Sequence, residues 1–380
     1  YTGTLAAAHG GVTSIVDFSN QVPGGTLAKT LQDKREEASG KALVDWGTHP
    51  VITQPTDETL DEIPLVVEKG APTIKCYMTY REDGLLIEIE DLERIAKRLS
   101  DSGGMLMLHA EDNSKIEENV PRLVKAGKTG SMYHAKSKPP EVETEAIRGI
   151  VEMARNTGAK FFVVHLASDG GLDLITAARA EGLDITAETC THYLMFTEDV
   201  LEREDGIKWI CSPPLREKPV QDRLWQGLQA GQIAMVTSDD AAYSWEAKLT
   251  GIDRFDKCPN GIPGIETRFH MLYSEGVAKG RLSLPHFVEL VATNPARLFG
   301  LAPLKGSITP GSDADIVLFD PDARWTMGQD TLHMGADWSA YEDIDIHGKI
   351  LKVFSRGELI VDGEECTAEK GRGRYIHRSL

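Results

Sequence analysis

The sequence has 380 residues, of which 41% are hydrophobic and 26% are charged, and this is the composition of a globular protein with a large core. Its length fits one barrel-sized domain together with a smaller one. Basic residues number 41 against 59 acidic ones, so the net charge of −18 argues against a nucleic-acid binder, which normally presents a basic face.

The cysteines and the N-terminal residues indicate a cytoplasmic protein. Five cysteines are widely scattered and form no CxxC pair, so the sequence suggests neither a zinc ribbon nor a redox dithiol. Reduced thiols are the simplest interpretation. No run of 18 apolar residues predicts a membrane span, and the first residues have neither the basic start nor the long apolar stretch of a signal peptide.

Short apolar runs alternate with helix-like segments along most of the chain. The opening TGTLAAAHGG predicts a helix that leads into the first run. Because the runs are mostly continuous rather than alternating, they predict strands of a parallel sheet that is buried on both faces. The runs span residues 13–18, 42–47, 73–78, 105–110, 161–166, 183–188 and 233–238, and the helical patterns span residues 27–39, 57–70, 90–102, 144–158 and 171–182.

These runs predict seven strands, whereas a closed (β/α)8 barrel needs eight. A chain that opens with a helix before its first predicted strand looks like such a barrel without its first strand. We therefore expect about 50–70 upstream residues. The alternative is an open, doubly wound sheet of seven strands, which a Gly-rich phosphate loop after a strand would favour. The sequence has no such loop of convincing form.

The pattern changes after about residue 300. Residues 286–301 predict the last helix of the barrel. The next segment has short β-type runs broken by Gly, Pro and Asp, which predict a small antiparallel β domain. We expect a barrel over residues 1–303, a small β-sandwich domain over residues 304–362 and a basic, extended tail over residues 363–380.

Four polar residues interrupt or follow the predicted strands. Lys75 lies inside TIKCYM, His109 ends MLMLHA, His165 lies near the end of FFVVHL, and Asp239 follows IAMVTS. Active sites of such barrels lie at the carboxyl ends of the strands, so these side chains are expected to converge. Two imidazoles and a carboxylate are good ligands for zinc or a similar divalent ion. A single strand-end histidine is more often a hydrogen-bonded core residue, but two of them with an aspartate favour a metal site.

Lys75 lies in the middle of an apolar strand, where a free ammonium group is costly to bury. Burial also lowers the pKa of a lysine and frees the lone pair of its amine. A neutral amine can add carbon dioxide to give a carbamate, an anionic group that can bridge two metal ions. An ion pair with a carboxylate would satisfy the same residue, and the spacing alone favours neither interpretation.

Nine segments occur in an order that resembles the hydantoinases and dihydropyrimidinases of the amidohydrolase superfamily. They are IKCYMTY, LHAEDN, VVHLAS, AETCTHYL, CSPPLR, TSDD, NGIPGIETR, VATNPARLFGL and GSITPGSDADIVLFD. Each segment alone is a weak signal, but together they are specific and extend over nearly the whole chain. The resemblance implies an α/β protein with a (β/α)8 TIM-type barrel of the metal-dependent hydrolase type, lacking its first strand, and a small β-sandwich domain.

The same resemblance implies two divalent ions, for which zinc is the expected metal. Lys75 matches a carboxylated lysine that bridges the ions, and His109 and His165 match the imidazole ligands of the more exposed one. Asp239 matches a catalytic aspartate that binds the other ion and transfers a proton. The family also carries a His-x-His pair on its first strand, and this sequence has none. The second ion is therefore expected to have only Lys75 and Asp239 as protein ligands.

The implied reaction is hydrolysis of a cyclic amide, a hydantoin or a dihydropyrimidine, to an N-carbamoyl amino acid by a metal-bridging hydroxide. Tyr80 matches the tyrosine that binds the substrate carbonyl and the oxyanion. Ser212 and Asn260 match residues that hold the ring amide, chiefly through main-chain contacts. Allantoinase, or another cyclic amidohydrolase, is a close alternative. A non-catalytic scaffold like the dihydropyrimidinase-related proteins is an alternative of a different class, and the retained ligands argue against it.

We expect no nucleic-acid or membrane partner, and a homotetramer, because family members associate and the GRGRYIHRSL tail looks suited to lie on a neighbouring subunit. Asp240 stands where the family usually has histidine. His192 lies close to the predicted site and is a candidate to support it. The remaining histidines are expected to be structural and to lie in helix-like, loop or β-domain stretches, away from the ends of the barrel strands; they are His9, His49, His134, His270, His286, His333, His347 and His377.

Overall fold

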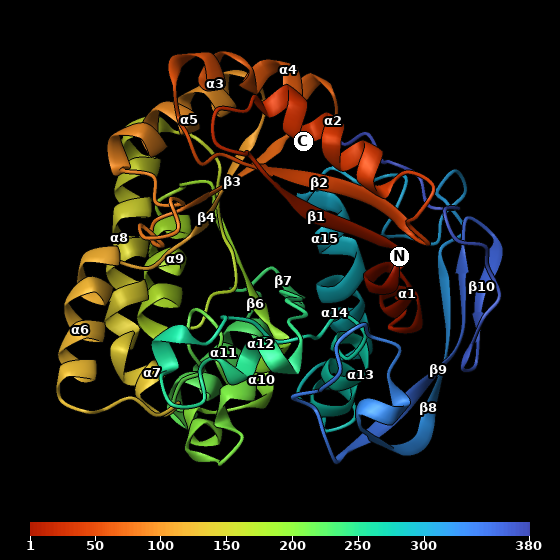
Figure 1. Ribbon diagram of the computed structural model, residues 1–380. Helices are drawn as coiled ribbons and strands as arrows, with labels where there is room; N and C mark the ends of the chain where they lie inside the picture. Colours follow the sequence, from red (N-terminus) through yellow and green to blue (C-terminus); the bar gives the residue numbers. More distant parts are fainter.

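The computed structural model describes residues 1–380 and contains a seven-stranded parallel sheet that curls into an incomplete barrel (Figure 1). Its strands pair in chain order, and none is inserted between two earlier ones. A doubly wound sheet reverses its strand order at a switch point, so the doubly wound alternative is wrong. The strands are β1 (Ser14–Asn20), β2 (Asp45–Val51), β3 (Thr73–Tyr77), β4 (Met105–His109), β5 (Phe161–Val163), β6 (Ile185–Cys190) and β7 (Met235–Thr237).

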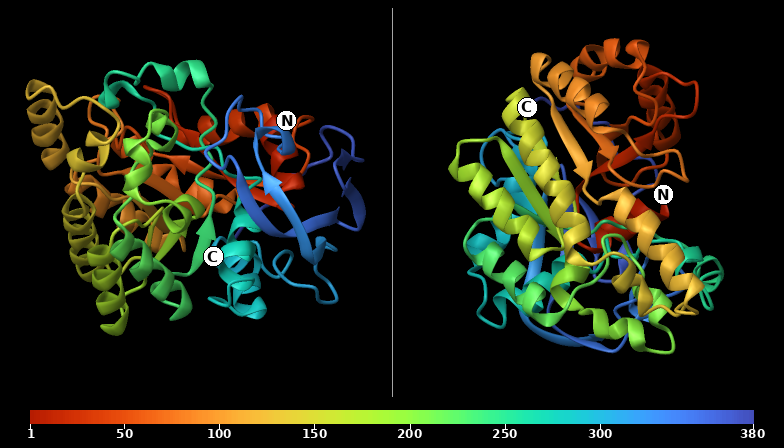
Figure 2. Two further views of the ribbon diagram at one scale, coloured as in Figure 1. Left: turned by 90° about the horizontal axis from the view of Figure 1, so that it is seen from below. Right: turned by 90° about the vertical axis from the view of Figure 1, so that its left-hand side faces the viewer.

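Helices follow most strands and cover the outer face of the curled sheet (Figures 1 and 2). No helix is both long enough and apolar enough to cross a lipid bilayer. The α-helices are α1 (Thr2–His9), α2 (Leu27–Ala38), α3 (Asp57–Asp61), α4 (Ile63–Glu68), α5 (Ile89–Asp101), α6 (Asn113–Lys125), α7 (Tyr133–Ser137), α8 (Pro140–Thr157), α9 (Asp169–Ala180), α10 (Thr191–Met195), α11 (Lys218–Gln229), α12 (Trp245–Leu249), α13 (Arg268–Leu272), α14 (Leu284–Val288) and α15 (Asn294–Leu298). Short 3-10 or π-helical turns are η1 (Glu198–Glu202), η2 (Gly206–Trp209), η3 (Phe255–Lys257), η4 (Tyr273–Val277), η5 (Glu289–Thr293) and η6 (Gln329–Thr331).

The two faces of each strand pack in different layers. On β4, Leu106 and Leu108 point outward and join the large core between sheet and helices. Met105 and Met107 belong instead to a small cluster inside the barrel. Because side chains alternate along a strand, His109 continues the inward-facing row and reaches the carboxyl end of the barrel interior.

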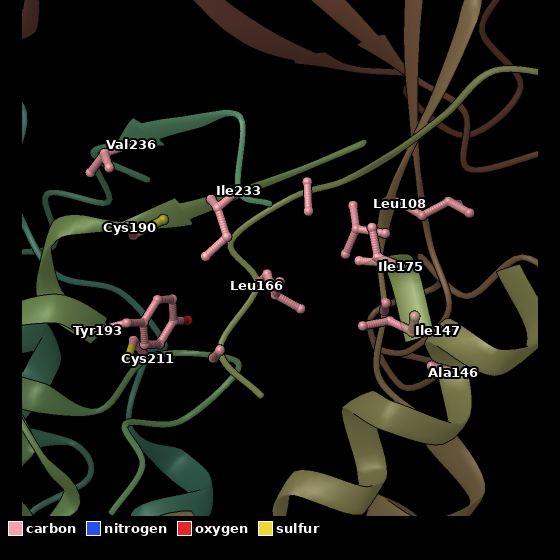
Figure 3. Packing of buried hydrophobic residues seen from close by; sticks show 14 of the residues in the cluster. Leu108, Ala146, Ile147, Leu166, Ile175, Cys190, Tyr193, Cys211, Ile233 and Val236 are labelled. Carbon is pink, nitrogen blue, oxygen red and sulfur yellow. The ribbon is translucent and has the colours of Figure 1, made fainter. Parts of the chain in front are cut away.

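Figure 3 shows part of the outer core, in which Leu108 and Leu166 lie near Ile147 of α8 and Ile175 of α9. All four side chains are fully buried. This packing fixes the strands that carry the polar residues at their ends. Burying one such side chain contributes roughly 1.5–3 kcal/mol.

One predicted strand is displaced along the sequence. The apolar run at residues 42–47 indicated a strand there, but β2 spans Asp45–Val51. His49 is the reason, because it interrupts the apolar pattern and is nevertheless buried inside the strand. Its Nδ1 lies 2.6 Å from Oγ1 of Thr73 on β3, and this hydrogen bond satisfies the imidazole. The expectation that His49 lies outside the barrel strands is wrong.

A four-stranded antiparallel sheet follows the barrel helices, in the order β11-β10-β9-β8. A buried lysine, Lys305, joins it to the barrel: Nζ lies 2.8 Å from Asp45 of β2, 2.9 Å from Asp313 and 2.8 Å from Asp315. These carboxylates compensate the buried cation. The strands are β8 (Ile316–Met327), β9 (Ile344–Ser355), β10 (Glu358–Asp362) and β11 (Glu365–Cys366).

The C-terminal tail packs on its own barrel. The main-chain N–H of Ile376 donates to the carbonyl oxygen of Trp46 on β2, at 2.7 Å. Arg378 is fully buried, and its guanidinium donates to the carbonyl oxygens of Phe299 and Thr48, at 3.1 Å and 2.5 Å. These contacts tie Ile376 and Arg378 to their own barrel. The expected contact of the tail with a neighbouring subunit stays a prediction, as does the tetramer.

Replacing Arg378 tests whether the tail holds the barrel together. Arg378→Met leaves two buried carbonyl oxygens without their donor, so the free energy of unfolding should fall by about 2–4 kcal/mol. Chemical denaturation measures it. Arg374→Met is the matched control, because Arg374 is exposed. Equal unfolding midpoints for the two variants would contradict this role.

Candidate active site

Seven residues that the sequence predicted for the site line one cavity of about 1060 Å³. Four different strand ends contribute to it, and two later loops complete it. A concave space with convergent polar groups is the usual form of an enzyme site. The residues are Lys75, Tyr80, His109, His165, Ser212, Asp239 and Asn260.

Backbone strain marks three of these positions. Outside glycine, positive φ occurs at only five residues, and three of them are Tyr80 at 65°, His165 at 41° and Asp239 at 44°. A left-handed conformation costs a non-glycine residue roughly 1 kcal/mol or more, so it persists only where the surrounding structure imposes it. Each of the three follows the end of a strand, and the reversed backbone leaves its side chain on the cavity wall.

Lys75 is buried in β3, with 2% of its surface exposed. Its Nζ lies 3.6 Å from the ring centroid of Tyr77 and 5.3 Å from that of Phe18. No carboxylate oxygen lies within 4.0 Å of this amine, so the structure excludes the ion-pair interpretation of Lys75. Burial lowers the pKa of Lys75 to about 7, although the charge of Asp239 opposes this. A neutral amine facing a cavity is the form that adds carbon dioxide.

His109 is oriented by a buried carboxylate. Its Nε2 lies 2.6 Å from Oε2 of Glu111, and both side chains are almost completely buried. The hydroxyl of Ser212 donates to the same oxygen at 2.7 Å, and Lys138 donates to that hydroxyl. With Nε2 as the donor to Glu111, the lone pair of His109 is on Nδ1. Burial alone would raise the pKa of Glu111, but Lys138 and then His109 hold it below its usual value.

His165 and Asp239 lack partners within the protein. The buried Nδ1 of His165 has no hydrogen-bond partner, and the rings of His109 and His165 are only 4.5 Å apart between centroids. Burial raises the pKa of Asp239 to about 6, although Lys75 opposes this. Buried polar atoms without partners call for an explanation, such as an ion. Two imidazoles and a carboxylate are donors that fit a divalent ion.

Two polar side chains of the cavity lining, Asn260 and Tyr80, contact each other. Nδ2 of Asn260 lies 3.4 Å from the hydroxyl of Tyr80, which is 180 residues away in the sequence. Burial, and then the charge of Glu111, holds the pKa of Tyr80 well above its usual value. The hydroxyl therefore stays protonated and is able to donate a hydrogen bond to an oxygen in the cavity.

Asp240 turns away from the ligand candidates. Its Oδ1 accepts from the main-chain N–H groups of Gly264 and Ile265, at 2.6 Å and 3.0 Å. The carboxylate therefore fixes the turn that follows Asn260 instead of orienting a metal ligand. This arrangement gives the aspartate at this position a defined structural role.

Three buried residues of the site were not singled out from the sequence. Glu111 lies two residues after His109, and this spacing could have indicated it. Lys138 reaches the site from the end of α7 and has no such signal. Glu188, on β6, lines the cavity, and burial raises its pKa to about 8, with Asp239 adding to the effect. His192 is buried behind the wall and does not line the cavity.

A second group of potential ligands lies away from this cavity. Ligand atoms of His9, Glu266 and His333 lie within 4.8 Å of one another. The two imidazole rings stack at 3.5 Å with an interplanar angle of 6°. Imidazole lone pairs lie in the ring plane, so two stacked rings cannot both direct one at the same ion. His333 instead binds Glu266 at 2.7 Å, which joins the β8–β9 connection to the barrel.

Comparison with known proteins adds an independent finding. A family model described as the amidohydrolase family matches residues 1–360. The chain is 40% identical over 381 aligned residues to the D-phenylhydantoinase of Escherichia coli O1:K1, covering 100% of this chain and 82% of that relative.

Solved structures of hydantoinases and of a dihydropyrimidinase have a similar fold over nearly the whole of this chain. The dihydropyrimidinase from Brevibacillus agri is similar with a TM-score of 0.97 at 38% identity, over 100% of this chain and 83% of that one. The L-hydantoinase from Arthrobacter aurescens is similar with a TM-score of 0.93 at 28% identity, over 99% of this chain and 83% of that one.

The contact of His109 with Glu111 predicts an effect on metal affinity. Glu111→Gln removes the charge that makes the His109 imidazole more basic, so zinc affinity should fall about 10-fold or more. Competition with a chromogenic chelator measures this. Glu145→Gln, on the exposed face of α8, is the control. An unchanged zinc affinity in Glu111→Gln would show that Glu111 has no effect on metal binding.

Proposed function

The chain belongs to the amidohydrolase family, and from that premise we propose that it hydrolyses the ring amide of hydantoins and dihydropyrimidines to give N-carbamoyl amino acids. One observation carries the proposal most strongly: the unpaired amine of Lys75 faces the same cavity as two imidazoles and the carboxylate of Asp239. The relatives named above are hydantoinases and a dihydropyrimidinase, which favours this function over that of an allantoinase.

The amidohydrolase family is generally metal-dependent, and four residues of the site would hold the ions. Lys75, after its amine adds carbon dioxide, would offer carbamate oxygens, beside a ring nitrogen each from His109 and His165 and an oxygen from Asp239. We propose zinc as the metal. Divalent ions supply an electrophile for the ring carbonyl and lower the pKa of water.

The remaining chemistry belongs to side chains of the cavity. Asp239 would accept the proton of the attacking water and pass it to the ring nitrogen as the amide bond breaks. The Tyr80 hydroxyl would donate a hydrogen bond to the carbonyl oxygen, where negative charge develops. The main chain at Ser212 and Asn260 would hold the ring amide between two loops. Preorganised donors of this kind act strongly because they already point at the place where charge develops.

A non-catalytic scaffold would have no use for these features. It would gain nothing from strained backbones at Tyr80, His165 and Asp239, which cost stability. It would gain nothing from an unpaired buried amine at Lys75 either.

We also propose that the working form is a cytoplasmic homotetramer. The free cysteines, four of the five buried, fit a reducing compartment.

The direct test is hydrolysis of 5-phenylhydantoin, unsubstituted hydantoin and dihydrouracil by the zinc-loaded protein. We expect N-carbamoyl products, detected by chromatography, from at least one of the three rings. Allantoin is the comparison substrate. Hydrolysis of allantoin alone would assign the chain to a different amidohydrolase activity, and no hydrolysis of any of them would refute the proposal.

Lys75→Ala tests the bridging ligand. Without the carbamate, the zinc content per chain should fall to about half of the wild-type value or less, because the bound metal loses a shared ligand. Elemental analysis measures the metal, and short carboxylic acids should restore part of the activity by replacing the carbamate. Lys160→Ala, at an exposed lysine next to β5, is the control. Full metal loading in Lys75→Ala would contradict this role.

Tyr80→Phe tests the proposed hydrogen-bond donor. Turnover should fall by about 10²–10³-fold, the effect of losing one donor to a developing oxyanion, while the fold and the metal content stay unchanged. Steady-state kinetics on dihydrouracil and a hydantoin measure it. Tyr133→Phe, whose hydroxyl lies outside the cavity lining, is the matched control. Equal turnover in the two variants would exclude Tyr80 from the chemistry.

A further inference from the structure

Lys248 is a fully buried lysine on α12, and its ammonium group has three main-chain acceptors. Nζ donates to the carbonyl oxygens of Ile210 at 3.0 Å, Pro259 at 2.9 Å and Gly261 at 3.1 Å. An ammonium group has three N–H donors, so all of them are used. No carboxylate forms an ion pair with it, unlike the buried Lys305, which is surrounded by carboxylates.

The three acceptors belong to the two segments that border the substrate cavity. Ile210 lies two residues before Ser212, and Pro259 and Gly261 are the neighbours of Asn260. The N–H of Gly261 also donates to the carbonyl oxygen of Ile210, at 3.0 Å. Lys248 therefore ties the main chain of segment 210–212 to that of segment 259–261.

Segment 259–261 packs closely against Ala241, which follows the end of β7. Gly261 has a φ of 153°, which favours glycine, and a Cβ at that position would lie 2.3 Å from Cβ of Ala241. On the same segment, Asn260 contacts the hydroxyl of Tyr80. A shift of segment 259–261 would therefore move Asn260 and change its contact with Tyr80.

Lys248 is itself held in place. The hydroxyl of Ser244 caps the start of α12 by accepting from the N–H of Ala247. The thiol of Cys258 donates to the main-chain carbonyl oxygen of Lys248, at 3.6 Å, and the ring of Trp338 lies 5.5 Å from Nζ. A desolvated ammonium with only carbonyl dipoles as partners is costly, and an apolar side chain would fill the same space more cheaply. Packing alone therefore does not account for a lysine at this position, whereas its hydrogen bonds to the two segments do.

We propose that Lys248 is a positioning residue that sets the distance between segments 210–212 and 259–261, and thereby fits the gap between Ser212 and Asn260 to a planar ring amide. This inference rests on the proposed function for the identity of the ligand. Lys248 does not touch the substrate, and it acts through the main chain of the two segments. A ring held between them contacts the same groups before and during the reaction, so their misplacement should appear mainly in KM.

Lys248→Met keeps the length of the side chain and removes all three donors. KM for a hydantoin should rise about 10-fold or more, with a smaller change in kcat and an unchanged zinc content. Amide hydrogen exchange gives a readout independent of activity. Exchange at Gly261, whose N–H bonds to Ile210, should become at least about 10-fold faster.

Lys305→Met is the matched control, because it also removes a buried ammonium with three acceptors, but away from the cavity. It should lower thermal stability and leave KM and the exchange at Gly261 at wild-type values. If Lys248→Met does not fold, Lys248→Gln replaces it, since its amide still donates two hydrogen bonds and should give an intermediate KM.

Wild-type KM and wild-type exchange in a folded Lys248→Met or Lys248→Gln protein would overturn the inference. An equal rise of KM in Lys305→Met would also overturn it, since this would indicate general loosening. If the wild-type protein hydrolyses no cyclic amide, the proposed function fails, and the exchange experiment still decides whether Lys248 fixes the two segments.

Discussion

The amine of Lys75 is the constraint on which the rest of the site depends. It projects from the middle of β3 into the barrel interior, where no carboxylate is close enough to pair with it. A charged ammonium in this place is unfavourable, so burial drives the amine toward its neutral form. Aromatic rings of Phe18 and Tyr77 surround it on the protein side. The only polar surroundings left to it are the cavity and the side chains at its rim.

Strand geometry then decides which side chains meet this amine. The register pairs Lys75 with Met107 and Tyr77 with His109, and alternation along β4 turns His109 inward with Met107. After the ends of β5 and β7, His165 and Asp239 also face the cavity, and there the backbone of each is left-handed. Packing of the outer helices supplies the free energy that keeps these residues strained.

Two further lysines show how the fold uses buried cations around the site. Lys138 contacts the hydroxyl of Ser212 and the carboxylate of Glu111, so it stabilises the negative partner of His109. Lys248 binds only carbonyl oxygens and holds two main-chain segments. The first cation lies beside the proposed metal ligands, and the second holds the two segments that we propose to bind the ring amide. Both rigidify loops, which carry most functional groups in folds of this kind.

The sequence by itself determined the sheet and four polar residues of the cavity, Lys75, His109, His165 and Asp239, because continuous apolar runs and their polar ends are local signals. Tyr80, Ser212 and Asn260 followed only from the order of the nine family-like segments. It missed the displacement of β2, since buried His49 breaks the apolar pattern and only its bond to Thr73 explains it. The tertiary structure alone decided that Lys75 has no ion-pair partner and that Glu111 binds Ser212, 101 residues away. It also decided that Arg378 binds Thr48, 330 residues away. Such hydrogen bonds form between distant parts of the chain, so no period or spacing in the sequence encodes them.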